Sequence, residues 1–128
     1  MKKWIVVPNK KVGDIEFGMK RKTVREVIGE EYKEFKKNIF SKNTTDDYGE
    51  FHVYYNGSEC EAVEIFEGEV VYKGFNIMKL NLQKIKELFE DLKEDGEGYY
   101  LSQKYSIGIT MDGNKIDAIL LGEKDYYI

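Results

Sequence analysis

The single histidine of this chain stands close in sequence to a tyrosine and two glutamates that could do acid–base chemistry with it. An Asn-Gly turn at residues 56–57, taken as a two-residue hairpin loop, places His52 opposite Glu61 and Tyr54 opposite Glu59. A neighbouring carboxylate favours the protonated imidazole, so such a pair could serve as general acid and general base. No nucleophile, phosphate-binding loop or metal-ligand set accompanies the group in the sequence, and a surface cross-strand pair contributes only about 0.2–1 kcal/mol. We therefore predict that these residues bind a partner, that the protein is not an enzyme, and that it carries no cofactor.

Two β-hairpins are predicted to position these side chains. The first covers residues 51–67, and the second, with Asp-Gly at residues 112–113, covers residues 107–121. Because side chains alternate across a strand, each hairpin divides into a buried face and a wetter face. The predicted buried faces carry Phe51, Val53, Cys60 and Ala62 in the first hairpin and Ile107, Ile109, Ile116 and Ala118 in the second. The wetter face of the first hairpin carries His52, Tyr54, Glu59 and Glu61. Glu64 falls on the buried side in this register, and its placement stays open.

Each hairpin follows a segment with helical spacing of apolar residues. Val24, Val27 and Ile28 predict a short helix that begins near residues 19–20 and ends at Gly29. An amphipathic stripe predicts a second helix over residues 82–93, with Asn81 as its N-cap. The order of helix then hairpin occurs twice, with the two turns 56 residues apart. We predict an α+β fold of two tandem helix–hairpin units, about residues 1–72 and 73–128, that form one antiparallel sheet with the helices packed on one face, in a single domain of residues 1–128.

Composition restricts the class of protein. The chain has 128 residues, of which 41% are hydrophobic and 34% charged, which is typical of a soluble globular domain. It contains no apolar run near the ~18 residues of a membrane helix and no secretory signal, so we predict a cytoplasmic protein that does not bind membranes. Cys60 is the only cysteine and His52 the only histidine. This excludes an internal disulfide and argues against a thiolate or histidine metal site.

Charge is unevenly distributed along the chain. The net charge of −4 combines +6 in residues 1–43, −8 in residues 44–71 and −2 in the remainder. Residues 44–71 contain 8 acidic and no basic side chains, so the first hairpin lies in the most acidic stretch. Such a surface repels nucleic acid and favours a basic partner protein. The competing interpretation is that an acidic surface only keeps the protein soluble.

Tyrosines and a pair of aspartates extend the predicted interface. The chain has 10 tyrosines, a residue that is enriched at protein interfaces and that also suits half-buried strands. Two adjacent aspartates in the preceding loop could hold a metal ion, but without further carboxylates at calcium-loop spacing they are better interpreted as turn residues. The predicted partner-binding set, which includes no metal ligand, is His52, Tyr54, Glu59, Glu61, Asp46, Asp47 and Tyr48.

A pattern around the first predicted helix resembles a known family. Gly18-Met19, Val24 and Gly29, preceded by Ile15, are similar to the opening G-M-[ST]-x-x-x-V-x-x-x-x-G of β-lactamase-inhibitor-like and outer-membrane-assembly-lipoprotein-like units, with Lys20 where that pattern has Ser or Thr. Two such units in tandem resemble the β-lactamase inhibitor protein architecture. The resemblance implies a concave sheet face that, with its loops, binds a partner protein.

These patterns together predict a small cytoplasmic bacterial protein-binding module. Its most concrete form is an immunity protein or inhibitor that neutralises a basic toxin, such as a nuclease, through an acidic sheet face that bears tyrosine. One alternative is a small enzyme or ligand-binding protein that uses His52, Glu61 and Tyr54. Another is a structural domain that associates with itself, so both a monomer and a homodimer stay open.

Overall fold

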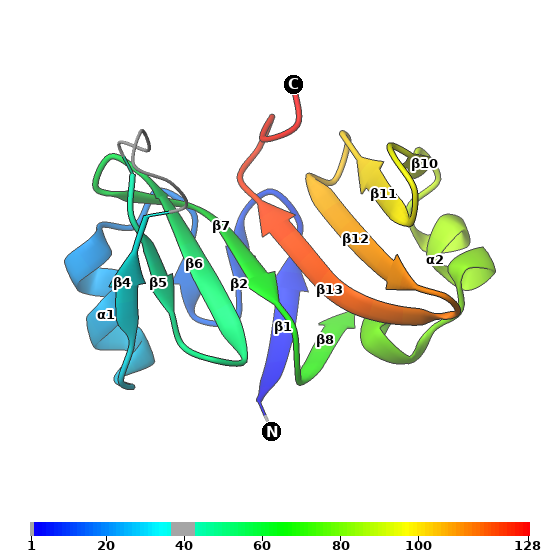
Figure 1. The fold of residues 1–128 in the computed structure, drawn as a ribbon. Helices are drawn as coiled ribbons and strands as arrows, with labels where there is room; N and C mark the ends of the chain where they lie inside the picture. Colours follow the sequence, from blue (N-terminus) through cyan, green and yellow to red (C-terminus); the bar gives the residue numbers. More distant parts are fainter. Residues whose placement is uncertain (1, 37–42) are drawn as a thin grey trace.

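The fold is a sandwich of two β-sheets with a short helix at each end (Figure 1). The computed structural model describes residues 2–36 and 43–128. Over that part of the chain, 47% of the residues are in strands and 15% in helices. The predicted α+β fold, with helices packed on one antiparallel sheet, is therefore wrong. A second sheet, and not the pair of helices, covers most of the buried face of the hairpins.

In the part of the chain that the structure describes, eight strands form the large sheet. In spatial order they are β10 (Lys93–Glu94), β11 (Tyr99–Ser102), β12 (Ile107–Asp112), β13 (Lys115–Gly122), β7 (Glu59–Ile65), β6 (Phe51–Asn56), β5 (Thr45–Asp47) and β4 (Lys33–Phe35). Strands β4 to β7 form one antiparallel meander and β10 to β13 form another. The two meanders meet at a single seam, where β7 pairs antiparallel with β13.

Five strands of the described residues form the small sheet. In spatial order they are β3 (Ile15–Glu16), β2 (Lys11–Val12), β1 (Lys3–Val7), β8 (Glu69–Tyr72) and β9 (Phe75–Asn76). Strands β1 and β8 run parallel, so that Lys3 is level with Glu69 and Ile5 with Val71. Pro8, which has no N–H to donate, lies just beyond the last residue of β1, so β1 pairs with a strand on each side.

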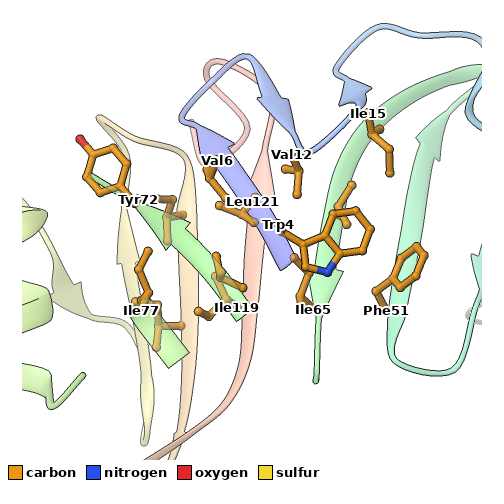
Figure 2. Packing of buried hydrophobic residues seen from close by; sticks show 14 of the residues in the cluster. Trp4, Val6, Val12, Ile15, Phe51, Ile65, Tyr72, Ile77, Ile119 and Leu121 are labelled. Carbon is orange, nitrogen blue, oxygen red and sulfur yellow. The ribbon is translucent and has the colours of Figure 1, made fainter. Parts of the chain in front are cut away.

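The core lies between the two sheets (Figure 2). Burial alternates along β1, where Trp4 and Val6 point inward and their neighbours point outward. The Trp4 ring meets the Phe51 ring edge-on, with 4.7 Å between the centroids. From the large sheet, Ile65, Ile119 and Leu121 complete the layer, all at most 1% exposed. Full burial of each such aliphatic side chain contributes about 1.5–3 kcal/mol, so this layer is the main source of stability.

The helices form where the sequence predicts them, but the second one is shorter. Helix α1 (Arg21–Ile28) ends at Gly29, whose φ of +63° is the left-handed conformation expected of a glycine stop. Helix α2 (Leu82–Leu88) begins at the predicted Asn81 cap, whose side chain accepts a hydrogen bond from the Lys84 N–H. It follows the 3-10 turn η1 (Ile77–Lys79) and stops five residues before the predicted end at residue 93.

Tertiary contacts explain why α2 stops early. The ring of Phe89, at the C-cap, is fully buried and stacks on Tyr72 of the small sheet at 5.0 Å. Two residues later, Asp91 accepts hydrogen bonds from the Ser102 hydroxyl at 2.6 Å and the Lys104 backbone N–H at 2.9 Å. Residues 93–94 then add a strand to the edge of the large sheet. The chain gains these contacts by leaving the helical path that its apolar spacing permits.

Both predicted hairpins form, but each is shifted from the predicted register. The loops are Gly57-Ser58 and Gly113-Asn114, and not residues 56–57 and 112–113. Gly57 has a φ of +64° and Gly113 a φ of +62°, while the residue before each has no positive φ. Glycine at the first loop position is the requirement of a type II′ turn. The predicted loops at residues 56–57 and 112–113 would instead be type I′ turns, which need a positive φ at both loop positions.

A β-bulge interrupts both hairpins at equivalent places. The register shifts after Tyr54 in the first hairpin and after Thr110 in the second, 56 residues later. The extra residue reverses the alternation beyond it, so Ala62 pairs with Tyr54 and Ala118 with Thr110, away from the faces predicted for these alanines. Glu64 moves by the same shift out of the core and pairs with His52.

Candidate functional site

His52 lies on the face of the large sheet that points away from the small sheet, which we call the outer face. Its Nε2 lies 3.2 Å from Oδ1 of Asp47, the neighbour on β5. Its cross-strand neighbour on β7 is Glu64, and not Glu61, so the predicted acid–base pair of His52 and Glu61 is not formed. Three aromatic rings surround the imidazole at centroid distances of 4.8, 5.5 and 6.2 Å, from Phe66, Phe35 and Tyr54. The arrangement is a half-buried aromatic cluster with a carboxylate on each side.

Tyr54 shares the outer face with His52, as predicted, but it is only 8% exposed. Its hydroxyl donates a 2.5 Å hydrogen bond to Glu64 Oε1. Burial, and then this hydrogen bond to a carboxylate, raise the pKa of the Tyr54 phenol above its ordinary value. Glu64 therefore has a structural use on this face. It fixes the Tyr54 ring beside the His52 cluster.

The last residues of the chain fold back over the other half of the outer face. A side chain on Gly122 would stand 2.6 Å from Cγ of Tyr126, and one on Gly108 would stand 2.1 Å from the Tyr127 hydroxyl. Tyr127 and Tyr99 share a 2.6 Å hydroxyl–hydroxyl hydrogen bond. The two glycines thus provide the space in which the tyrosines pack. Glycine inside a strand marks such a close approach, a signal that could have located this contact from the sequence.

Two of the predicted site residues, Glu59 and Glu61, do not pair with His52 or Tyr54. Glu59 is at the tip of the first hairpin, where its carboxylate is 3.5 Å from the Lys20 ammonium group at the start of α1. Glu61 occupies the bulge of β7, and its carbonyl accepts a hydrogen bond from the Glu123 N–H of the chain that follows β13. Neither glutamate is a cross-strand neighbour of His52 or Tyr54 in the observed register.

Asp46 is fully buried and belongs to a structural network, not to a surface. Its carboxylate accepts hydrogen bonds from Nε of Arg25 at 2.8 Å and from a terminal guanidinium nitrogen of the same side chain at 2.7 Å. The Tyr55 hydroxyl donates a third hydrogen bond at 2.9 Å. The hydrogen bond to Asp46 raises the pKa of the Arg25 guanidinium above its ordinary value. This network joins helix α1 to strands β5 and β6, so the predicted role of Asp46 in partner binding does not fit its burial.

Tyr48 packs on the core side of the first meander. Its ring stacks on the Phe51 ring, with 4.7 Å between the centroids and an interplanar angle of 7°. The centroid of the exposed Tyr32 ring lies 5.6 Å from that of Tyr48. Burial raises the pKa of Tyr48 to about 12. An open groove lined by Glu31, Tyr32, Lys33, Asp47, Tyr48 and Gly49 runs beside it. Tyr48 and His52 therefore lie on opposite faces of the large sheet. Asp47 contacts His52 and also lines the groove beside Tyr48.

Part of the negative charge of residues 44–71 is neutralised by ion pairs with other residues of the same chain. Asp46 pairs with Arg25 and Glu59 with Lys20, so each uses a basic residue from the positively charged start of the chain. Asp47 and Glu64 stay on the outer face, on opposite sides of His52. The uneven charge of the sequence therefore reflects internal pairing as well as surface charge.

No family model, curated protein or solved structure matches this chain. The resemblance to β-lactamase-inhibitor-like units stays a prediction. Among residues 2–36 and 43–128, no three His, Cys, Asp or Glu side chains are grouped as metal ligands. Within the same ranges no helix is long and apolar enough to cross a membrane.

Proposed function

We propose that the outer face of the large sheet binds a basic partner protein. The observation that carries the proposal is the cluster of His52 with Phe35 and Phe66, flanked by Asp47 and Glu64. Aromatic residues supply most of the energy at protein interfaces, and carboxylates around them favour lysine and arginine of the partner. The cluster is preorganised by ring contacts and by the rigid strands β5, β6 and β7, which reduces the entropy lost on binding.

The most concrete form of this function is a bacterial cytoplasmic immunity protein or inhibitor that neutralises a basic toxin, such as a nuclease. Negative charge near an aromatic contact site steers a basic partner and increases its association rate. Such an interaction is sensitive to salt, because the steering is screened over about 10 Å at 0.1 M ionic strength. An inhibitor of this kind has no need of catalytic groups, and its contribution is to cover the surface of the toxin.

The test uses two phenylalanines of nearly equal exposure on different faces. Phe35 is 36% exposed on the outer face, and Phe75 is 39% exposed at the edge of the small sheet. A partner captured from the native cell by the wild-type protein is purified, and its association is measured against the Phe35→Ala, Phe75→Ala and Asp47→Asn variants. We expect Phe35→Ala to weaken binding about tenfold or more and Phe75→Ala to leave it unchanged. We expect Asp47→Asn to lower the association rate at low salt and to reduce its salt dependence. If the Phe35→Ala variant binds the partner as tightly as the wild-type protein, the outer face is not the binding surface.

A further inference from the structure

The outward side of the small sheet carries the largest aliphatic exposure in the described strands. Ile5 is 60% exposed and Val7 39% exposed, both on β1, and Val71 on β8 lies beside Ile5. Among the large hydrophobic side chains of residues 2–36 and 43–128, only Ile128 at the end of the chain is more exposed than Ile5. Strand β1 pairs with β2 on one side and with β8 on the other, so it is an interior strand that offers its side chains to another surface. We call Lys3, Ile5, Val7, Glu69 and Val71 the small-sheet face.

We propose that the small-sheet face docks against the same face of a second copy of this chain. The two copies are related by a two-fold axis that lies in the interface and runs along the strands between β1 and β8. This dimer is independent of the partner-binding function proposed above, because it uses the opposite side of the sandwich.

The register of the parallel pair makes this face complementary to itself. Lys3 is level with Glu69, and Ile5 is level with Val71. A two-fold rotation about an axis along the strands exchanges the positions of β1 and β8 without reversing their direction. Lys3 of one copy then lies over Glu69 of the other, and Ile5 lies over Val71. Each opposite-charge contact and each aliphatic contact occurs twice, as an isologous interface requires.

The geometry of packed sheets permits this arrangement. Two sheets that pack face to face keep their strand directions within about 30° of each other at a separation of about 10 Å, with aliphatic side chains between them. At the next level along the strands, Val7 is paired with Lys11, whose own neighbour on β3 is Glu16. The charged border of the face is therefore of mixed sign, which suits a second copy better than a strongly acidic or basic partner.

The interface is small, so the association is weak and reversible. Interfaces that bury less than about 1,200 Å² in total belong to transient complexes. We expect a monomer–dimer equilibrium that becomes visible by sedimentation equilibrium between ~10 μM and ~1 mM protein, the range in which weak complexes dissociate. In the same range we expect backbone amide NMR shifts that depend on concentration at Ile5 and Val71 and not at His52.

The decisive experiment uses two variants with one charge reversal each. The Lys3→Glu variant carries glutamate at positions 3 and 69, and the Glu69→Lys variant carries lysine at positions 3 and 69. Each variant alone repels itself across the two-fold axis, and we expect its dimerisation constant to weaken about tenfold. A one-to-one mixture restores both opposite-charge contacts, so we expect it to associate within about threefold of the wild-type protein. Lys115→Glu, the same charge change at the exposed tip of the second hairpin, serves as the control and leaves dimerisation unchanged.

The outcomes separate this dimer from every other use of the face. A wild-type chain that stays monomeric to ~1 mM overturns the proposal, and leaves the face to a different partner. A mixture that associates no better than its two components also overturns it, because that result places the contact elsewhere. Circular dichroism melting curves establish that both variants are folded. If either is not, the NMR dilution experiment on the wild-type protein decides the matter through the residues that shift.

Discussion

Replacing Arg25 tests whether its pair with Asp46 holds helix α1 to the large sheet. The Asp46 side chain has no exposed surface, whereas that of Arg25 is 24% exposed and also lies 3.6 Å from the Glu34 carboxylate. Replacing Arg25 and replacing Asp46 should therefore destabilise the protein by different amounts, because the partner that remains is buried in one case and partly exposed in the other. Arg25→Met leaves a carboxylate in the core, where the Tyr55 hydroxyl still donates a hydrogen bond to it. Asp46→Asn leaves a guanidinium that can turn to Glu34 or to water.

This inequality sets the expected magnitudes. Removing one partner of a buried ion pair costs about 3–5 kcal/mol, and the remaining hydrogen bond places Arg25→Met near the lower end, at about 3 kcal/mol. For Asp46→Asn we expect about 1–2 kcal/mol, the cost of a weakened buried hydrogen-bond set. The double substitution of Arg25→Met with Asp46→Leu removes both charges. It should therefore cost less than Arg25→Met alone, because no unpaired charge stays buried.

The assay is urea unfolding followed by the fluorescence of Trp4, the single tryptophan, which is 7% exposed. Lys20→Met is the control. It removes a cation at the start of α1 whose ion pair with Glu59, at 3.5 Å, is exposed on both sides (65% and 54%), so we expect a loss of about 1 kcal/mol or less. A loss for Arg25→Met no greater than that for Lys20→Met would refute the assignment of Asp46 as a buried anchor.

Two further predictions concern tyrosines. Gly122→Ala places a methyl group against the Tyr126 ring and should cost about 1–3 kcal/mol, whereas the same change in a Tyr126→Ala background should cost much less; urea unfolding of the four proteins measures this coupling, and additive losses would contradict the packing. Burial raises the pKa of Tyr48 and of Tyr126 from 10.0 to about 12, so between pH 10 and 12 the unfolded chain releases protons that the folded chain retains. Stability should therefore fall as pH rises through this range, with ionisation at 295 nm delayed until unfolding, and a melting temperature that stays constant to pH 12 would contradict it.

Local signals predicted local structure correctly. Gly29 ends α1 and Asn81 caps α2 because each acts on backbone groups within four residues of itself. The existence of both hairpins also follows from short-range turn chemistry. Their register does not, because an Asn-Gly or Asp-Gly pair can supply either both loop residues or only the first one through its glycine. The choice between them depends on the bulge and on the core behind it.

The small sheet could not be found in the same way. Strands β2, β3 and β9 have only two residues each, too few for alternation to show. The parallel pairing of β1 with β8 joins residues 66 positions apart, as Lys3 with Glu69 shows. For the candidate site, alternation correctly placed His52 and Tyr54 on one face. It could not show that Asp46 would be drawn into the core by an arginine 21 residues earlier.

The seam between β7 and β13 has a consequence for how the chain is made. Strand β7 ends at residue 65 and its partner β13 at residue 122. At a synthesis rate of about 5–20 residues per second, β13 is completed about 3–11 seconds after β7. During that interval β7 is an unpaired edge with several apolar residues, the kind of edge that pairs with other chains. Glu64 stands in the middle of the segment that β13 will cover, flanked by Val63 and Ile65. We expect a negative charge at that position to oppose pairing between nascent edges until β13 is made. In the folded sheet the Glu64 carboxylate accepts a hydrogen bond from the Tyr54 hydroxyl.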